Sequence, residues 1–126
     1  PKIYFIDSGL RNTVTKTFSS NLSGQLFENY VYSELIKLNY TPKYWRTKAG
    51  SEVDFVLETG NGLIPIEVKL SPVNEKIERS LHSFISTYKP KKAIIAGYNV
   101  KEGEKDVEGC RVIFTDASRL STALRA

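Results

Sequence analysis

The segment 51–70, SEVDFVLETGNGLIPIEVKL, constrains the fold of this chain more than any other. Apolar and polar residues alternate on both sides of Gly60-Asn61-Gly62, which predicts two antiparallel strands joined by a tight turn. A turn at Gly60-Asn61 places Asp54 opposite Glu67, whereas a turn at Asn61-Gly62 places it opposite Lys69. Both registers put the three charged side chains on one face, with Cβ atoms roughly 5–8 Å apart. A three-residue loop would need a bulge to keep this arrangement.

This charged cluster is unusual among strands that are otherwise built from Ile, Val, Phe and Leu. Two acids that face each other across a strand pair repel each other and destabilise the pair. A divalent cation would convert the repulsion into coordination, because it binds carboxylate oxygens. The alternative is a solvated face on which Lys69 pairs with Glu67 or Asp54. The hairpin alone leaves both interpretations open.

The composition bounds the classes of function. The chain has 126 residues, of which 40% are hydrophobic and 25% charged, which suits one globular domain. Its net charge of +4 favours anionic partners. The single cysteine excludes an internal disulfide and favours a reducing compartment, so we expect a cytoplasmic protein. No apolar run approaches the roughly 18 residues of a membrane span, and no G-x-x-x-x-G-K-[ST] loop predicts an ATP site within these residues.

Nothing in the sequence supports catalysis by a nucleophilic side chain. Cys110 has neither a histidine nor a second cysteine nearby, which indicates a small buried strand residue. His82 is the only histidine and lacks the partners of a catalytic triad, so we expect it at or near the surface.

Residues 23–39 have the strongest helical pattern, with Ser23 as the expected N-cap. Their apolar residues recur at helical spacing and predict one buried stripe, formed by Phe27, Val31, Leu35 and Leu38. Glu28 lies about 60° from the centre of that stripe at 100° per residue, and therefore points towards whatever the helix packs on. The alternative role for Glu28 is an acid of the first turn that the helix dipole favours.

The remaining pattern predicts an α/β fold, a mixed sheet flanked by helices. Strands are expected at 2–6, 40–47, 92–98 and 110–115, and helices at 75–88, capped by Asn74, and at 116–125. Residues 10–22 are expected to form a loop or short helix, and residues 100–109 a charged loop. We therefore expect an N-terminal strand and linker over 1–22 and one domain over 23–126.

Basic and aromatic residues interleave just before the hairpin, at Lys43, Trp45, Arg46 and Lys48. Such a pattern can bind a nucleic-acid backbone and stack on its bases. The alternative is a core tryptophan on a strand with a charged end.

Three motifs together resemble the PD-(D/E)XK nuclease superfamily: FENYVYSEL with Glu28, YWRTKAGSEVDFVLE with Asp54, and IPIEVKLS with Glu67 and Lys69. They are most similar to the uncharacterised C-terminal domain of prokaryotic AAA- or STAND-type ATPases. The opening segment KIYFIDSGLRN also resembles the segment that leads into that domain. The resemblance covers nearly the whole chain, and its one departure is Val53, where the motif has proline. It implies an α-β-β-β-α-β core of the restriction-endonuclease type. Since the chain lacks methionine, we expect a fragment of a longer protein with the ATPase upstream.

The resemblance also implies a chemistry. Asp54 and Glu67 would hold Mg²⁺ or Mn²⁺, with the Val68 carbonyl and with Glu28 directly or through water. Lys69 would orient the attacking water or stabilise charge on the phosphate. The implied function is a Mg²⁺-dependent endonuclease acting on branched or duplex DNA, with Arg46 and Lys48 on the phosphate backbone. The alternative is a catalytically inactive module that binds nucleic acid or protein and regulates the ATPase.

Overall fold

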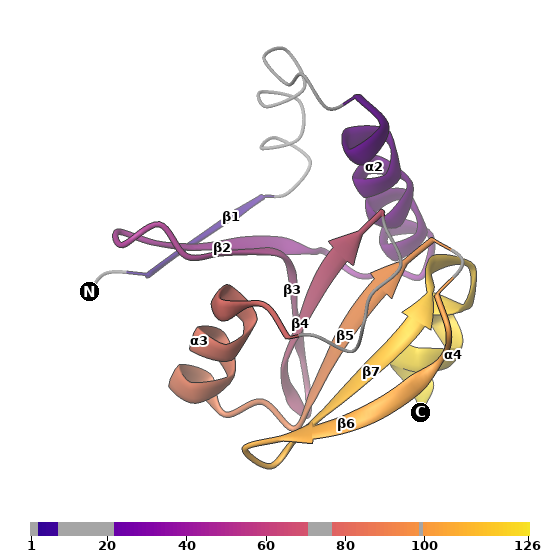
Figure 1. The fold of residues 1–126 in the computed structure, drawn as a ribbon. Coiled ribbons are helices and arrows are strands. Elements are labelled where there is room, and N and C mark those ends of the chain that lie inside the picture. Colours follow the sequence, from indigo (N-terminus) through magenta and orange to yellow (C-terminus); the bar gives the residue numbers. More distant parts are fainter. Residues whose placement is uncertain (1–2, 8–21, 71–76, 99) are drawn as a thin grey trace.

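The computed structural model describes residues 3–7, 22–70, 77–98 and 100–126, and it is a mixed α/β fold (Figure 1). One sheet contains seven strands in the order β1-β2-β3-β4-β5-β7-β6. The strands are β1 (Ile3–Asp7), β2 (Lys43–Thr47), β3 (Glu52–Thr59), β4 (Gly62–Lys69), β5 (Lys92–Gly97), β6 (Gly103–Val107) and β7 (Cys110–Asp116). The helices are α2 (Leu22–Lys37), α3 (Arg79–Tyr88), the 3-10 turn η1 (Ala117–Arg119) and α4 (Leu120–Arg125). The order α2-β2-β3-β4-α3-β5 confirms the expected α/β core.

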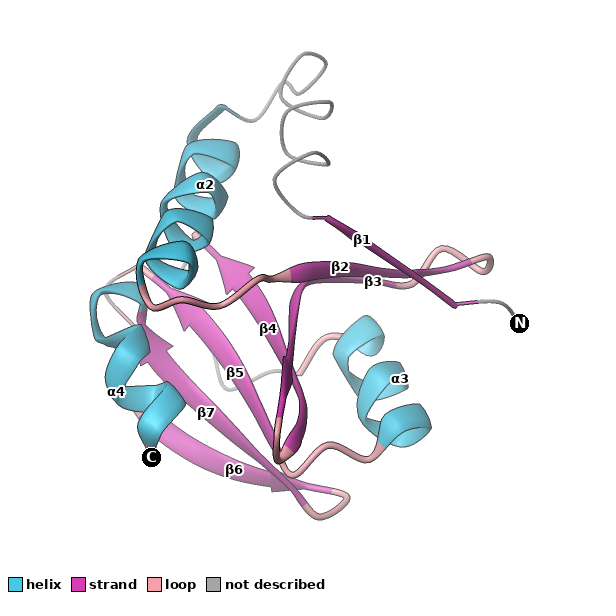
Figure 2. Cartoon of the chain, turned by 180° about the vertical axis from the view of Figure 1, so that it is seen from behind, coloured by secondary structure: helices cyan, strands magenta, loops and turns pink. Residues whose placement is uncertain are grey.

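Helices cover both faces of the sheet (Figures 1 and 2). On one face α2 and α4 bury a core formed by residues such as Val31, Leu35, Phe55, Ile66, Ile94 and Leu120. On the other face α3 packs Leu81 and Ile85 onto Ile95, Val112 and their neighbours. The central strands β5 and β7 are almost entirely buried, as expected for parallel strands with helices on both sides.

The hairpin has the first of the two expected registers. Thr59 pairs with Gly62, so Gly60-Asn61 is the two-residue turn. Phe55 pairs with Ile66, and the side chains of both residues lie in the core under α2. Glu67 and Lys69, which alternate with Ile66 and Val68, therefore lie on the opposite face, which α3 covers.

The expectation of a loop at 100–109 is wrong, because this segment contains the edge strand β6, which pairs with β7. Most of its side chains are exposed, so it has no apolar alternation; charged edge strands of this kind resist further pairing. The expected start of the second helix is also wrong. Ile77 and Glu78 precede α3, which begins at Arg79. Asn74, the expected cap, lies outside the described residues.

The first long helix is shifted by one or two residues from its expected range. It begins at Leu22, so Ser23 lies inside it and is not its cap. Leu38 lies beyond its end and is 38% exposed, whereas Val31 and Leu35 are fully buried as expected. Helix ends are the least certain part of any pattern-based expectation, because the apolar stripe does not define where a helix stops.

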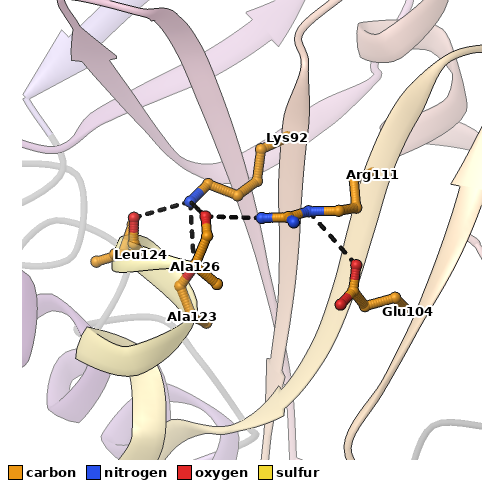
Figure 3. Close-up of polar contacts among 6 residues, drawn as sticks. All are labelled: Lys92, Glu104, Arg111, Ala123, Leu124 and Ala126. Atoms are coloured by element: carbon orange, nitrogen blue, oxygen red, sulfur yellow. Dashed lines mark hydrogen bonds and ion pairs between the residues drawn. The ribbon is translucent and has the colours of Figure 1, made fainter.

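Lys92, at the start of β5, attaches the end of α4 to the sheet (Figure 3). Its Nζ donates hydrogen bonds to the carbonyl oxygens of Ala123, Leu124 and Ala126 at 3.2, 2.8 and 3.0 Å. Arg111, paired with Lys92 across β5 and β7, donates another to Ala126 at 2.7 Å. Burial, and then the charge of Arg111, lower the pKa of Lys92. The two cations satisfy carbonyl groups that a helix end leaves without intrahelical partners.

Lys92→Met is therefore expected to lower the free energy of unfolding by about 1.5–3 kcal/mol, the usual contribution of hydrogen bonds from a charged group. Urea unfolding of the variant measures the loss. Lys91→Met is the matched control, because Lys91 is exposed, and it should change stability by no more than about 0.5 kcal/mol. Equal stability of the two variants would contradict this role of Lys92.

Candidate functional site

The strands β3 and β4 separate at Asp54. Their backbone pairing ends at Phe55 and Ile66, but β4 continues beside β5 as far as Lys69, opposite Gly97. β3 bends away at this point (Figures 1 and 2). The Oδ2 of Asp54 accepts a hydrogen bond from the backbone N–H of Val68 at 2.9 Å. A carboxylate thus occupies the place that a backbone carbonyl would have in a continuing ladder. We call the region where β3 and β4 separate, beyond Phe55 and Ile66, the fork.

Glu67 lies inside the fork and is only 9% exposed. Burial raises its pKa well above the usual value, and the charges of Asp54 and Glu78 raise it further. The Lys69 ammonium and a hydrogen bond with the Asp54 backbone oppose this shift. A buried acid beside a second acid is a site where a cation would be favourable.

Lys69 completes the expected group of three charged residues. Its Nζ forms an ion pair with Glu78, which immediately precedes α3. The Lys69 side chain is 25% exposed and that of Glu78 is 46% exposed. Asp54, Glu67 and Lys69 are therefore brought together on one face, as both hairpin registers required.

Glu78 is the residue of this site that sequence analysis missed. The expected helix over 75–88 included Glu78, but α3 begins only at Arg79. The Glu78 side chain makes no capping hydrogen bond to α3, and its carboxylate contacts Lys69. The only feature of the sequence that could have indicated Glu78 is an acid a few residues after Glu67 and Lys69. Glu75 has the same feature, so the sequence does not distinguish the two.

Gly97 explains how the end of β4 is fixed. A Cβ atom at this position would lie 3.0 Å from the carbonyl oxygen of Lys69 and would collide with the Val100 side chain. Glycine at this position therefore leaves room for Val100 and for the carbonyl at the end of β4. The backbone that carries Lys69 is thus supported by β5 on one side, while its other side faces the fork.

Glu28 lies on α2 and is half-buried. Its helix α2 covers the opposite face of the sheet from Glu67 and Lys69. Within residues 3–7, 22–70, 77–98 and 100–126, no three His, Cys, Asp or Glu residues form a group that could hold a metal ion. A role for Glu28 or for the Val68 carbonyl as a ligand stays a prediction.

Trp45 was proposed to contact nucleic acid, and this assignment is wrong. Its side chain is fully buried and packs edge-on against Phe84, with ring centroids 5.2 Å apart. Its Nε1 donates a hydrogen bond to the Tyr88 hydroxyl at 3.2 Å. The ring therefore belongs to the core beneath α3 and cannot stack on a base, which is the alternative that the sequence left open.

The basic residues around Trp45 have different positions. Arg46 and Lys48 are exposed at the end of β2 and in the turn that follows. Lys43 is half-buried, and its Nζ lies 3.6 Å from the Oε1 of Glu58. Arg46 and Lys48 thus remain candidates for a phosphate contact, whereas Lys43 already has an acidic partner.

Cys110 and His82 take no part in the site. Cys110 is buried, and burial together with Asp106 raises its pKa to about 11, so its thiol stays protonated. His82 is exposed on α3, as expected.

The donor set of the fork suits Mg²⁺ or Mn²⁺. Mg²⁺ usually takes one or two carboxylates from a protein and keeps several waters. Asp54 and Glu67 supply two carboxylates, and the charge of Asp54 raises the pKa of Glu67. Asp54 already accepts the Val68 N–H with Oδ2, so that oxygen is fixed in place.

The comparisons with known proteins place the chain in a family. Residues 23–119 match the model of a domain of unknown function, DUF4143. No curated protein is similar enough to match. Among the described residues, no helix is long and apolar enough to cross a membrane. The family model spans most of the chain, and the chain therefore belongs to the DUF4143 family of domains of unknown function.

Proposed function

We propose that this domain hydrolyses phosphodiester bonds in DNA with the help of Mg²⁺ or Mn²⁺. The observation that supports the proposal best is the fork, where Asp54 and Glu67 meet beside Lys69 on two separating strands. Two acids and one ammonium, held beside each other where two strands separate, are the groups that phosphodiester hydrolysis needs. The resemblance to PD-(D/E)XK nucleases, carried by the same residues, supports it further.

Each residue has a distinct role in this proposal. Asp54 and Glu67 would hold the cation, which when bound polarises a phosphate oxygen and makes water more acidic. Lys69 would place its positive charge against the developing negative charge of the phosphate. Arg46 and Lys48 would bind the phosphate backbone beyond the fork without reading sequence. The resemblance to ATPase-linked domains further suggests that an ATPase on the same chain controls the reaction.

A second function is favoured by a different observation. Two of the catalytic candidates already have partners within the protein. Asp54 accepts a hydrogen bond from the Val68 N–H, and Lys69 forms an ion pair with Glu78. A fork whose charges satisfy one another would also suit an inactive module that binds nucleic acid or protein and regulates the ATPase. Metal binding separates the two functions, because only hydrolysis requires it.

The test is titration calorimetry of the full-length protein with Mn²⁺. We expect wild type to bind Mn²⁺, and Asp54→Asn and Glu67→Gln to weaken that binding about tenfold or more. Glu58→Gln is the matched control, because Glu58 lies on the same strand as Asp54 but pairs with Lys43 at the surface. Its affinity should equal that of wild type.

A gel assay with linear and branched DNA completes the test. Wild type should cleave in the presence of Mg²⁺ and ATP, and Asp54→Asn should not. Absence of Mn²⁺ binding by wild type, or equal cleavage by wild type and Asp54→Asn, would reject the hydrolytic function.

A further inference from the structure

We propose that Glu78 controls the access of a nucleic-acid phosphate to Lys69 by competing for its ammonium group. This inference rests on the proposed function, since it assigns a phosphate contact to Lys69. Glu78 is thereby a positioning residue that acts on Lys69.

The geometry supports competition over simple surface pairing. The Glu78 carboxylate contacts the Lys69 Nζ directly, and it lies close enough to Glu67 to raise the pKa of that acid. The charges of Asp54, Lys69 and Glu78 thus all act on the buried Glu67. Glu78 is the more accessible residue of the ion pair, because 46% of its side chain is exposed and only 25% of the Lys69 side chain is. An incoming anion would therefore meet Glu78 at the mouth of the fork.

Glu78 lies at the edge of the core and not within it. It stands between Ile77, which is buried, and Arg79, which begins α3, and its own side chain makes no hydrogen bond that caps the helix. A half-exposed ion pair contributes little stability, so a phosphate group with its charge-assisted hydrogen bonds can replace the carboxylate. Lys69 itself stays fixed, because β4 is held by β5 at Gly97.

The competition has a consequence for affinity. Removing the charge of Glu78 should release Lys69 to the phosphate and tighten the binding of nucleic acid. A neutral residue at 78 would also reduce general repulsion of any polyanion, and that effect does not need Lys69. Only a double-mutant cycle between residues 69 and 78 separates the two causes.

The experiment measures binding of a fluorescent duplex oligonucleotide to the full-length protein, with EDTA present so that no cleavage occurs. Glu78→Gln should bind about two- to fivefold more tightly than wild type, the range of a partly exposed ion pair. In a Lys69→Met background the same change should leave affinity unaltered. Glu58→Gln, which removes the charge of another ion-paired glutamate, is the control for general repulsion.

A second measurement needs no nucleic acid. Lys69 should react faster with an amine-acylating reagent in Glu78→Gln than in wild type, as read by mass spectrometry. The exposed Lys91 serves as the internal reference. Unchanged acylation of Lys69 would overturn the inference, because Glu78 would then not hold the ammonium.

The outcomes also distinguish this inference from the hydrolytic function. Tighter binding of equal size with and without Lys69 would overturn the competition and leave hydrolysis standing. A non-additive cycle with faster acylation, but no cleavage by any variant, would support Glu78 and reject hydrolysis. Failure of every variant to bind the duplex would overturn both.

Discussion

Trp45→Ala should lower the free energy of unfolding by about 3–5 kcal/mol, the usual cost of deleting a large buried aromatic side chain. The ring has no exposed surface, and its contacts with Phe84 and Tyr88 connect β2 to α3. Its hydrogen bond to the Tyr88 hydroxyl would also be lost. The cavity would lie where β2 and the bent half of β3 meet the helix, so Asp54 would lose support as well.

Urea or thermal unfolding measures this loss, followed by circular dichroism so that the variant needs no tryptophan. Trp45→Phe should cost less than Trp45→Ala, because it keeps most of the apolar contact. Tyr88→Phe isolates the hydrogen bond and should cost about 1–3 kcal/mol, the penalty of leaving the indole N–H without its partner.

The same variants test the corrected assignment of Trp45. As the only tryptophan in the chain, it reports its own environment by fluorescence. Its emission in wild type should be that of a buried indole and should not change when DNA is added. A Trp45→Phe variant with normal stability and weakened DNA binding would contradict the core position.

The hairpin and its charged group could be predicted because several local patterns agreed. Alternation in both strands assigned Glu67 and Lys69 to one face, whichever of the two possible turns was formed. Successive side chains of a strand point to opposite faces of the sheet. Asp54 was therefore expected on the same face as Glu67 and Lys69. The sequence was therefore sufficient for the face, which is the same in both registers, whereas the choice between the two registers came from the structure.

The remainder of the site depends on contacts between distant segments. Glu78 meets Lys69 because it lies directly before α3, and no local sequence pattern encodes that contact. Trp45 sits between basic residues in sequence, but the bend of β3 and the packing of α3 determine that its ring points inward. β6 pairs with β7 through its backbone, which side-chain patterns do not show.

Glu67→Gln is expected to stabilise the metal-free protein at neutral pH, by an amount that grows as the pH rises. In wild type the folded-state pKa of Glu67 is raised, because burial and the charge of Asp54 disfavour the carboxylate. Between the ordinary value of 4.5 and that raised value, the folded state binds more protons than the unfolded state. The free energy of unfolding therefore falls as the pH increases through this window, by at most about 1.4 kcal/mol per pH unit. Glutamine has no proton to lose, so the slope due to residue 67 should disappear.

Chemical denaturation at a series of pH values, with EDTA present, measures the difference between wild type and Glu67→Gln. Glu58→Gln is the control, since the Glu58 side chain is 55% exposed and its removal should leave the slope unchanged. Adding Mn²⁺ near neutral pH should then raise the stability of wild type but not that of Glu67→Gln, because a ligand that binds only the folded state stabilises it. Parallel stability curves for wild type and Glu67→Gln would contradict the buried, acid-paired state of Glu67. Parallel curves would also remove the electrostatic reason for a cation in the fork.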